Sequence, residues 1–378
     1  MRKITLALFL FCTTLSFAQE EEMPSWFSNL SFSGSVDAYY RTNLNSINKF
    51  SEPDGNGVYM APGSSFANRP GFAIGMANTF FSYEGEKVGA VADLVFGPRG
   101  VDAVFNSTGN SSIVNQLYVY WNVSESVTLT FGNWNTFLGY EVISPTANFN
   151  YSTSYMFSYG PFSHTGLKAD FAIDDNWSAM LAVMNATDFT EFNPNGSYTF
   201  GGQLGYSGDN GSTFLNVLVG DQDGNYEDEG EPENNGTLFQ VDLTTGYDLT
   251  DTFYLGFNAT YNTTSYADGS TYDDTGFYGV ALYAQVALSD TFSLGLRPEY
   301  FSEFGEFGAI DQIGNPDFYD DGDANVFAAT LSGNVKIGEL TLIPEFRIDT
   351  ASEDAFFDRD LESQKSLGSF VLAAVYSF

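Results

Sequence analysis

Hydrophobic and polar residues alternate along most of this chain. Phe253, Leu255 and Phe257 fall on one face of a segment whose other face carries Gly256 and Asn258. A period of two predicts β-strands. These runs hold for about ten residues, the length of a tilted membrane strand, whereas strands of soluble proteins are usually nearer five or six. The pattern therefore favours a membrane barrel over a β-sandwich.

The connections between these runs alternate short and long. Short polar turns are expected at residues 84–87, 124–126, 174–176, 207–211, 250–251, 289–290 and 336–339. Longer links are expected near 42–70, 98–111, 136–161, 187–196, 221–235, 263–275, 302–323 and 350–365. Short turns at one rim and long loops at the other are typical of outer-membrane barrels.

We therefore predict an all-β protein, a transmembrane up-and-down antiparallel β-barrel of about 16 strands with short periplasmic turns and long extracellular loops. Segments 72–83 and 212–220 alternate poorly, which leaves the strand count open by two. The last ten residues, Ser369–Phe378, predict the strand that closes the barrel against 30–40. Phe370, Leu372 and Tyr376 would then face lipid.

The amino-terminal residues predict export. Residues 1–18 combine a cationic start, a short apolar run and a small-x-small sequence that ends at Ala18, as in a secretory signal peptide. The barrel would then span 19–378. Cys12, the one cysteine, lies in this segment, so we expect no disulfide. No run of about twenty apolar residues follows, which argues against a membrane-spanning helix.

Composition agrees with a β-rich chain and excludes some partners. Aromatic residues make up 17% of the sequence, and the formal net charge is −35. A charge of this sign argues against binding to nucleic acid. Acidic residues crowd the links near 221–235, 302–323 and 350–365. The predicted lumen carries both signs of charge, from Asp37, Arg41, Asp93, Lys168, Asp170, Arg297, Glu299, Glu345 and Arg347.

Several runs resemble one known family. They are Tyr151–Leu167, Asn133–Pro145, Gly34–Thr42 and Val371–Phe378. They are similar to the OmpL-like β-barrel porins (the porin-2 group) common in Bacteroidetes. The resemblance covers essentially the whole chain after the signal peptide. It implies a Gram-negative outer-membrane barrel with porin activity, and it does not imply a particular solute. A carboxy-terminal Phe378 resembles the end that the barrel-assembly machinery reads in such proteins.

The third long link, 136–161, is the candidate constriction. In sixteen-stranded general porins the third loop folds inward and narrows the pore. This link has the same ordinal position, and Glu141 is its only acid. We expect Tyr140, Glu141, Tyr151, Tyr155 and Tyr159 near the constriction. The alternative is a loop that covers the barrel mouth for structural reasons alone.

Two acidic runs could bind calcium through oxygen ligands. One contains Asp221, Asp223 and Asn225, and the other contains Asp320, Asp321 and Asp323. The glycine of the first run comes one place too early for an EF-hand, and no helices flank it. A solvated acidic loop is the simpler interpretation, and no other cofactor is expected.

His164, the only histidine, lies beside Ser163. Neighbours on a strand point to opposite faces, so this pair does not predict an active site, and we expect no enzyme activity. The leading hypothesis is a passive porin for small hydrophilic solutes with modest cation preference. A non-conducting structural or recognition barrel is the alternative.

A channel specific for oligosaccharides also stays open, since Tyr39, Tyr118, Tyr120, Trp134, Tyr254 and Tyr283 are expected to face the lumen. The expected surroundings are outer-membrane lipid and lipopolysaccharide, and a homotrimer is compatible with the sequence.

Overall fold

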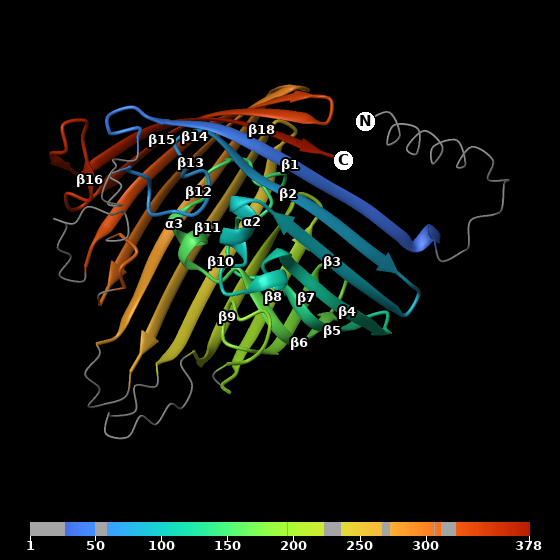
Figure 1. Ribbon diagram of the computed structural model, residues 1–378. Coiled ribbons are helices and arrows are strands. Elements are labelled where there is room, and N and C mark those ends of the chain that lie inside the picture. Colours follow the sequence, from blue (N-terminus) through green and yellow to red (C-terminus); the bar gives the residue numbers. More distant parts are fainter. Residues whose placement is uncertain are drawn as a thin grey trace, which may run out of the picture.

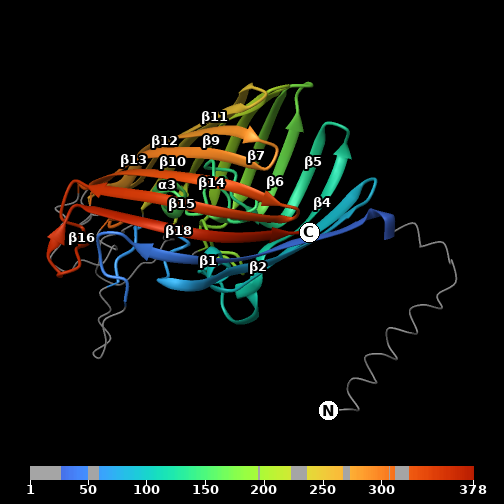
Figure 2. The same cartoon turned by 90° about the horizontal axis from the view of Figure 1, so that it is seen from above.

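The computed structural model describes residues 27–49, 59–194, 196–222, 236–266, 273–305, 307–310 and 323–378. Within these ranges, sixteen long strands form one closed antiparallel barrel (Figure 1). Consecutive strands pair with each other, and β18 pairs with β1 to close the ring, as Figure 2 shows from above. The predicted 16-stranded up-and-down barrel is confirmed.

The barrel strands are 8 to 15 residues long. In chain order they are β1 (Leu30–Asn43), β2 (Gly71–Glu84), β3 (Val88–Phe96), β4 (Val114–Ser124), β5 (Val127–Asn135), β6 (Ser163–Ala172), β7 (Trp177–Met184), β8 (Thr199–Gly208), β9 (Gly211–Asp221), β10 (Thr237–Thr250), β11 (Phe253–Ser265), β12 (Thr275–Ser289), β13 (Phe292–Phe304), β14 (Asn325–Ile337), β15 (Leu340–Ala351) and β18 (Ser366–Ser377). The seven predicted turns all lie between consecutive strands, and both poorly alternating segments lie in strands, namely β2 and β9.

Short elements occupy the long loops. The second loop contains helix α2 (Pro98–Ala103) and the 3₁₀ helix η3 (Gly109–Ile113), and the third contains α3 (Tyr155–Tyr159). The eighth contains a small hairpin of β16 (Phe356–Phe357) and β17 (Ser363–Gln364), and η2 (Phe27–Asn29) precedes β1. The predicted signal peptide lies outside the described residues. Among the described helices, none has the length and apolarity to cross a membrane.

The closing strand shows how the alternation is used. Along β18, Val371, Ala373 and Val375 are buried, whereas Leu372 and Tyr376 are exposed on the outer surface. The main chain of Phe378 continues the pairing, because its N–H and carbonyl both bond with Gly34 at 3.0 Å. Large apolar side chains thus cover the outside of the barrel, as a lipid-facing surface requires.

The packed interior lies inside the ring of strands and is formed by loop residues together with inward side chains of the wall. In the largest buried cluster, Tyr155 and Met156 of the third loop pack with Phe277 and Phe301 of the wall and Phe356 of the eighth loop. The inner faces of β10, β11, β13 and β15 carry many polar buried side chains, whereas the inner face of β18 is mostly apolar. The lumen therefore has a wall of hydrogen-bonding groups, and these groups position the third loop.

Candidate functional site: a loop folded into the barrel

The third loop, residues 136–162 between β5 and β6, lies within the barrel. The side chains of Tyr151, Thr153 and Tyr155 are fully buried. A loop in this position has backbone N–H and carbonyl groups that pair with no neighbouring strand. Each such group costs free energy if it is buried without a partner. The wall provides these partners.

Three carboxylates of the wall accept backbone N–H groups of the third loop. Glu345 of β15 accepts those of Tyr151 at 2.7 Å and Ser152 at 3.1 Å. Glu299 of β13 accepts those of Tyr155 at 3.0 Å and Met156 at 2.9 Å. Asp242 of β10 accepts that of Gly139 at 3.0 Å. Hydrogen bonds to an ionised carboxylate are about twice as strong as neutral ones. These carboxylates thus fix the path of the loop.

Two wall arginines bind the loop's carbonyl groups and its one acid. Arg297 of β13 forms a buried ion pair with Glu141 and donates to the carbonyl of Ser152 at 2.7 Å. Arg347 of β15 donates to the carbonyl of Thr153 at 2.7 Å and pairs with Asp349 at 2.8 Å. Breaking a buried pair of this kind from one side costs about 3–5 kcal/mol, because the other charge is left uncompensated.

Glycines on the inner faces of four strands make room for the loop's side chains. A Cβ atom on Gly295 would lie 2.1 Å from the ring of Phe149, and one on Gly256 would lie 2.6 Å from Tyr140. A Cβ atom on Gly279 would lie 2.7 Å from Met156, and one on Gly201 would lie 2.7 Å from Phe137. Real Cβ atoms essentially never come so close. The wall is therefore shaped to the loop.

Phenol groups attach the loop at two further points. Tyr151 donates its hydroxyl to Asp37 of β1. Tyr140 donates to the hydroxyl of Tyr254 at 2.7 Å and stacks on Tyr283, with ring centroids 3.8 Å apart. Burial raises the pKa of Tyr140 and Tyr151 far above the usual range, and the neighbouring Asp37 charge adds to this for Tyr151. Both phenols stay neutral donors.

The other side of the third loop is covered by the first and second loops. Thr153 donates to the carbonyl of Ser65 in the first loop. Arg99 of α2 donates to the carbonyl of Ile143 at 3.0 Å and to that of Tyr151 at 3.3 Å. The third loop is thus held from both sides.

The five residues predicted near the constriction all belong to this inserted loop, and their environments differ. Tyr151 and Tyr155 are fully buried, and Glu141 is 4% exposed. Tyr140 and Tyr159 are half-buried, and the hydroxyl of Tyr159 donates to the carbonyl of Ala309 at 2.7 Å. Their role in limiting the pore stays a prediction.

The nine predicted lumen charges all have described partners. Five of them contact the third loop directly, namely Asp37 of β1, Arg297 and Glu299 of β13, and Glu345 and Arg347 of β15. Arg41 donates to Tyr59 of the first loop at 2.9 Å. Asp93 accepts from Asn115 at 2.6 Å. Lys168 and Asp170 form a more exposed ion pair at 2.9 Å.

His164 follows the third loop and contacts its first two residues. His164 is buried, bonds with the Thr136 hydroxyl at 3.0 Å and contacts Phe137. Of the six candidate calcium ligands, Asp221 and Asp323 are described, and Asp223, Asn225, Asp320 and Asp321 lie outside the described residues. Among the described residues, no cluster of three acidic, histidine or cysteine side chains suits a metal.

Sequence reasoning missed three features of the site. Arg99 lies in a predicted outer link, and its insertion beneath the loops has no local signal. Asp242 lies on the inner face of β10, and strand alternation does not indicate that it accepts the N–H group of Gly139. The inward glycines carried a usable signal, because Gly256, Gly279 and Gly295 replace polar side chains on inner faces. A strand glycine often marks the close approach of another chain segment.

The chain was compared with known proteins. Residues 29–378 match the family described as "Putative beta-barrel porin-2, OmpL-like". No curated protein matches the chain. The outer-membrane channel DcaP of Acinetobacter baumannii has a TM-score of 0.57 and 14% identity, over 92% of this chain and 97% of that one.

Two further solved structures are similar in fold. OmpF of Salmonella typhi, in complex with daunomycin, has a TM-score of 0.56 and 12% identity, over 92% of this chain and 97% of that one. A loop L8 deletion mutant of OmpT from Vibrio cholerae has a TM-score of 0.55 and 10% identity, over 92% of this chain and 99% of that one. Identities this low show the fold alone. The family match covers nearly the whole chain, so the chain belongs to the OmpL-like β-barrel porin-2 family and is an outer-membrane protein.

Proposed function

We propose that this porin is a narrow passive channel for small hydrophilic solutes, with a modest preference for cations. The observation that carries the proposal is the third loop, which lies inside the barrel and is bonded to β1, β10, β13 and β15. A loop fixed in this way narrows the lumen and sets an upper limit on solute size. Because it has partners on several strands, its position should not fluctuate between open and closed.

The cation preference rests on the placement of acidic residues. The links 221–235, 302–323 and 350–365 are rich in Asp and Glu, in a chain with 48 acidic and 13 basic residues. Negative charge at a channel mouth raises the local concentration of cations. This effect is electrostatic and long-range, so it should weaken as salt shortens the Debye length to about 3 Å at 1 M.

One observation favours a second candidate, a non-conducting barrel with a structural or recognition role. The third loop is covered by Ser65 and Arg99 on the side away from the wall, so it has contacts on both sides. A loop that fills the lumen completely would have such contacts too. Conductance distinguishes the two candidates directly.

The oligosaccharide-specific channel has less support. Tyr39, Trp134 and Tyr283 are 6%, 5% and 3% exposed, so these rings offer no free face for a sugar to slide along. Tyr118, Tyr120 and Tyr254 keep partial exposure. These three residues are insufficient grounds to propose sugar transport.

The proposed surroundings follow from the barrel surface. Its apolar outer face suits outer-membrane lipid. The Phe378 ring is exposed, with its centroid 5.6 Å from that of Phe32, and we propose that the assembly machinery binds there. A homotrimer and contact with lipopolysaccharide stay proposals. Chemical crosslinking in native membranes tests the first of them.

Liposome swelling with sugars of graded size tests the proposed function. We expect uptake of monosaccharides and a sharp fall for larger solutes, together with a reversal potential that favours cations in a salt gradient. Absence of swelling and of ohmic current from correctly refolded protein would support the non-conducting barrel. A reversal potential that favours anions would remove the cation preference alone.

A further inference from the structure

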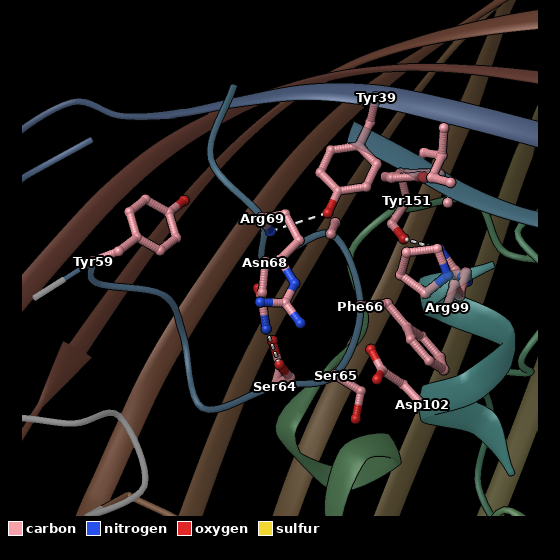
Figure 3. Close-up of a pocket in the computed structure, with 14 residues that line it drawn as sticks. Tyr39, Tyr59, Ser64, Ser65, Phe66, Asn68, Arg69, Arg99, Asp102 and Tyr151 are labelled. Atoms are coloured by element: carbon pink, nitrogen blue, oxygen red, sulfur yellow. Dashed lines mark hydrogen bonds between the residues drawn. The ribbon is translucent and has the colours of Figure 1, made fainter. Parts of the chain in front are cut away.

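A cavity of about 360 Å³ lies between the first loop, β1, β2, α2 and the third loop (Figure 3). Its volume is at the lower end of the range for ligand sites, about 300–1,000 Å³, so an occupant must be small. The polar groups that line it come from elements far apart in the sequence. The ones that matter here are Tyr39, Tyr59, Arg69, Arg99, Asp102 and Tyr151.

Arg99 is buried beside the cavity, and no described carboxylate forms an ion pair with it. It is 3% exposed, and its two hydrogen bonds go to the uncharged carbonyl groups of Ile143 and Tyr151. Its Nη2 atom has no hydrogen-bond partner within the described part of the chain. The guanidinium lies over the rings of Phe66 and Tyr151, at 4.4 Å and 5.2 Å from their centroids. A buried charge held only by neutral groups stabilises an approaching anion.

Two more arginines add positive charge around the cavity. Arg69 is exposed, and its guanidinium makes no ion pair or hydrogen bond with a described residue, while its backbone N–H donates to the Tyr39 hydroxyl at 3.0 Å. Arg41 lies behind the lining residues, donating to the Tyr59 hydroxyl at 2.9 Å and to the Asn43 side-chain oxygen at 3.2 Å. Neither of these two acceptors carries a charge.

The nearby carboxylates form no ion pair with these three arginines in the described part of the chain. Asp102 lines the cavity; burial raises its pKa, and the charge of Arg69 opposes that rise. Asp37 is bonded to the Tyr151 hydroxyl and to the backbone N–H of Met76. Three guanidinium groups thus face two carboxylates, and one of the two is already engaged by two donors.

We propose that this cavity binds a small organic acid through its carboxylate, with Arg69 as the exposed partner and the Arg99 charge beneath it. The planar guanidinium of Arg69 suits a bidentate carboxylate contact, and the Tyr39 hydroxyl is placed to donate to the same group. Asp102 also lines the cavity, and its carboxylate competes with the ligand for the charge of Arg69. This inference rests on the proposed function, because it treats the bound acid as a solute of the proposed channel.

Such a site is compatible with an acidic channel mouth. The acidic links lower the concentration of anions near the barrel, which slows the capture of a dilute organic acid. A cavity that retains the acid after it enters offsets this, because binding energy is local and screened less than the field of the loops. The net effect is selection among anions, with small inorganic anions excluded and carboxylates retained.

Isothermal titration of the refolded full chain in detergent tests the site. The probes are succinate, its uncharged analogue succinamide, and inorganic phosphate. We expect saturable binding of succinate, none of succinamide and weaker binding of phosphate. Arg69→Gln should weaken succinate binding about tenfold, the loss expected for one hydrogen bond to a charged group. Arg359→Gln is the matched control, because Arg359 is an exposed arginine of the eighth loop away from the cavity.

The substitution Asp102→Asn should change the affinity for succinate in the opposite direction. It removes the carboxylate that competes for Arg69, so succinate should bind more tightly, about threefold. Three outcomes would each overturn the proposal. They are equal effects of Arg69→Gln and Arg359→Gln, equal binding of succinate and succinamide, and phosphate binding as tight as succinate binding. Current through planar bilayers separates the two proposals. Succinate binding without current would contradict the proposed channel and support the binding site. Current without succinate binding would support the channel and contradict the binding site.

Discussion

Two regions of the lumen use arginine in different ways. On the wall formed by β13 and β15, Arg297 pairs with Glu141 and Arg347 pairs with Asp349. Around the cavity, Arg41 and Arg99 are equally buried, yet their hydrogen bonds go to hydroxyl, amide and carbonyl oxygens. In the first region each arginine has a carboxylate in direct contact. The second has positive charge that no described carboxylate neutralises by direct contact.

The difference indicates separate roles. Charges on the wall bind the backbone of the third loop, so they determine where the lumen is narrowed. Charges around the cavity hold the first loop and α2 in place, and they leave a positive potential that attracts an anionic solute. Carboxylates mark the structural region, because a loop buried in a barrel mostly needs acceptors for its N–H groups. Substitutions in the two regions should therefore have different consequences.

The largest effect is expected from Arg297→Gln. This change leaves Glu141 buried without its cation, which should lower the free energy of unfolding by about 3–5 kcal/mol and release part of the third loop. Urea unfolding in lipid vesicles, followed by tryptophan fluorescence, measures the loss. The double substitution Glu141→Gln with Arg297→Gln should recover part of it. If the double variant is as unstable as the sum of the single ones, the pair is not coupled as described.

A smaller effect is expected from filling an inner-face glycine. Gly295→Val places side-chain atoms where the ring of Phe149 lies, and overpacking of this kind costs about 1–3 kcal/mol. The displaced loop should also raise single-channel conductance and its noise. Gly202→Val is the matched control, because a Cβ atom there meets nothing nearer than 3.3 Å. Identical currents from the two variants would show that the third loop does not depend on this contact.

Arg41→Gln should cost less than Arg297→Gln although both side chains are buried. Its hydrogen bonds go to the Tyr59 hydroxyl, the Asn43 amide and the Ala67 carbonyl, so its removal leaves no directly paired carboxylate alone. We expect a loss of about 1–2 kcal/mol in urea unfolding. A loss that equals that of Arg297→Gln would erase the distinction between the two regions.

The smallest effect concerns calcium, the weaker of the two interpretations of the acidic runs that contain Asp221 and Asp323. Millimolar affinity at 1 mM calcium would stabilise the fold by about 0.4 kcal/mol. Chelation with EDTA should then lower the unfolding midpoint only slightly, and Asp221→Asn should abolish that shift. A shift that persists in the variant would move any calcium site elsewhere.

The barrel was predictable from sequence because strand alternation and turn chemistry are local. Alternation in segments such as Phe253–Tyr261 indicated which side chains face lipid and which face the lumen. Polar pairs such as Ser289–Asp290 indicated where the turns lie. The number of strands followed from these two signals. Closure followed from Ser369–Phe378, whose partner β1 was the only strand left unpaired at that edge.

The site was only partly predictable, because its contacts join distant residues. The third loop was identified by its order and length, and the charged residues of the wall by their inner-face positions. Their pairing was not, since nothing local indicates that Glu299 accepts the N–H groups of Tyr155 and Met156. The cavity was missed altogether, because Arg69 and Arg99 belong to links for which alternation gives no information.

The central claim is that the third loop, fixed by the wall, limits conduction. Its most direct test is the single-channel conductance of the full chain beside a variant in which residues 138–160 are replaced by a short Gly-Ser linker, both refolded and shown to form barrels by circular dichroism. We predict a small, quiet conductance for the natural sequence and a severalfold larger one for the variant. Equal conductances would contradict the claim, because the barrier to flow would then lie outside the third loop.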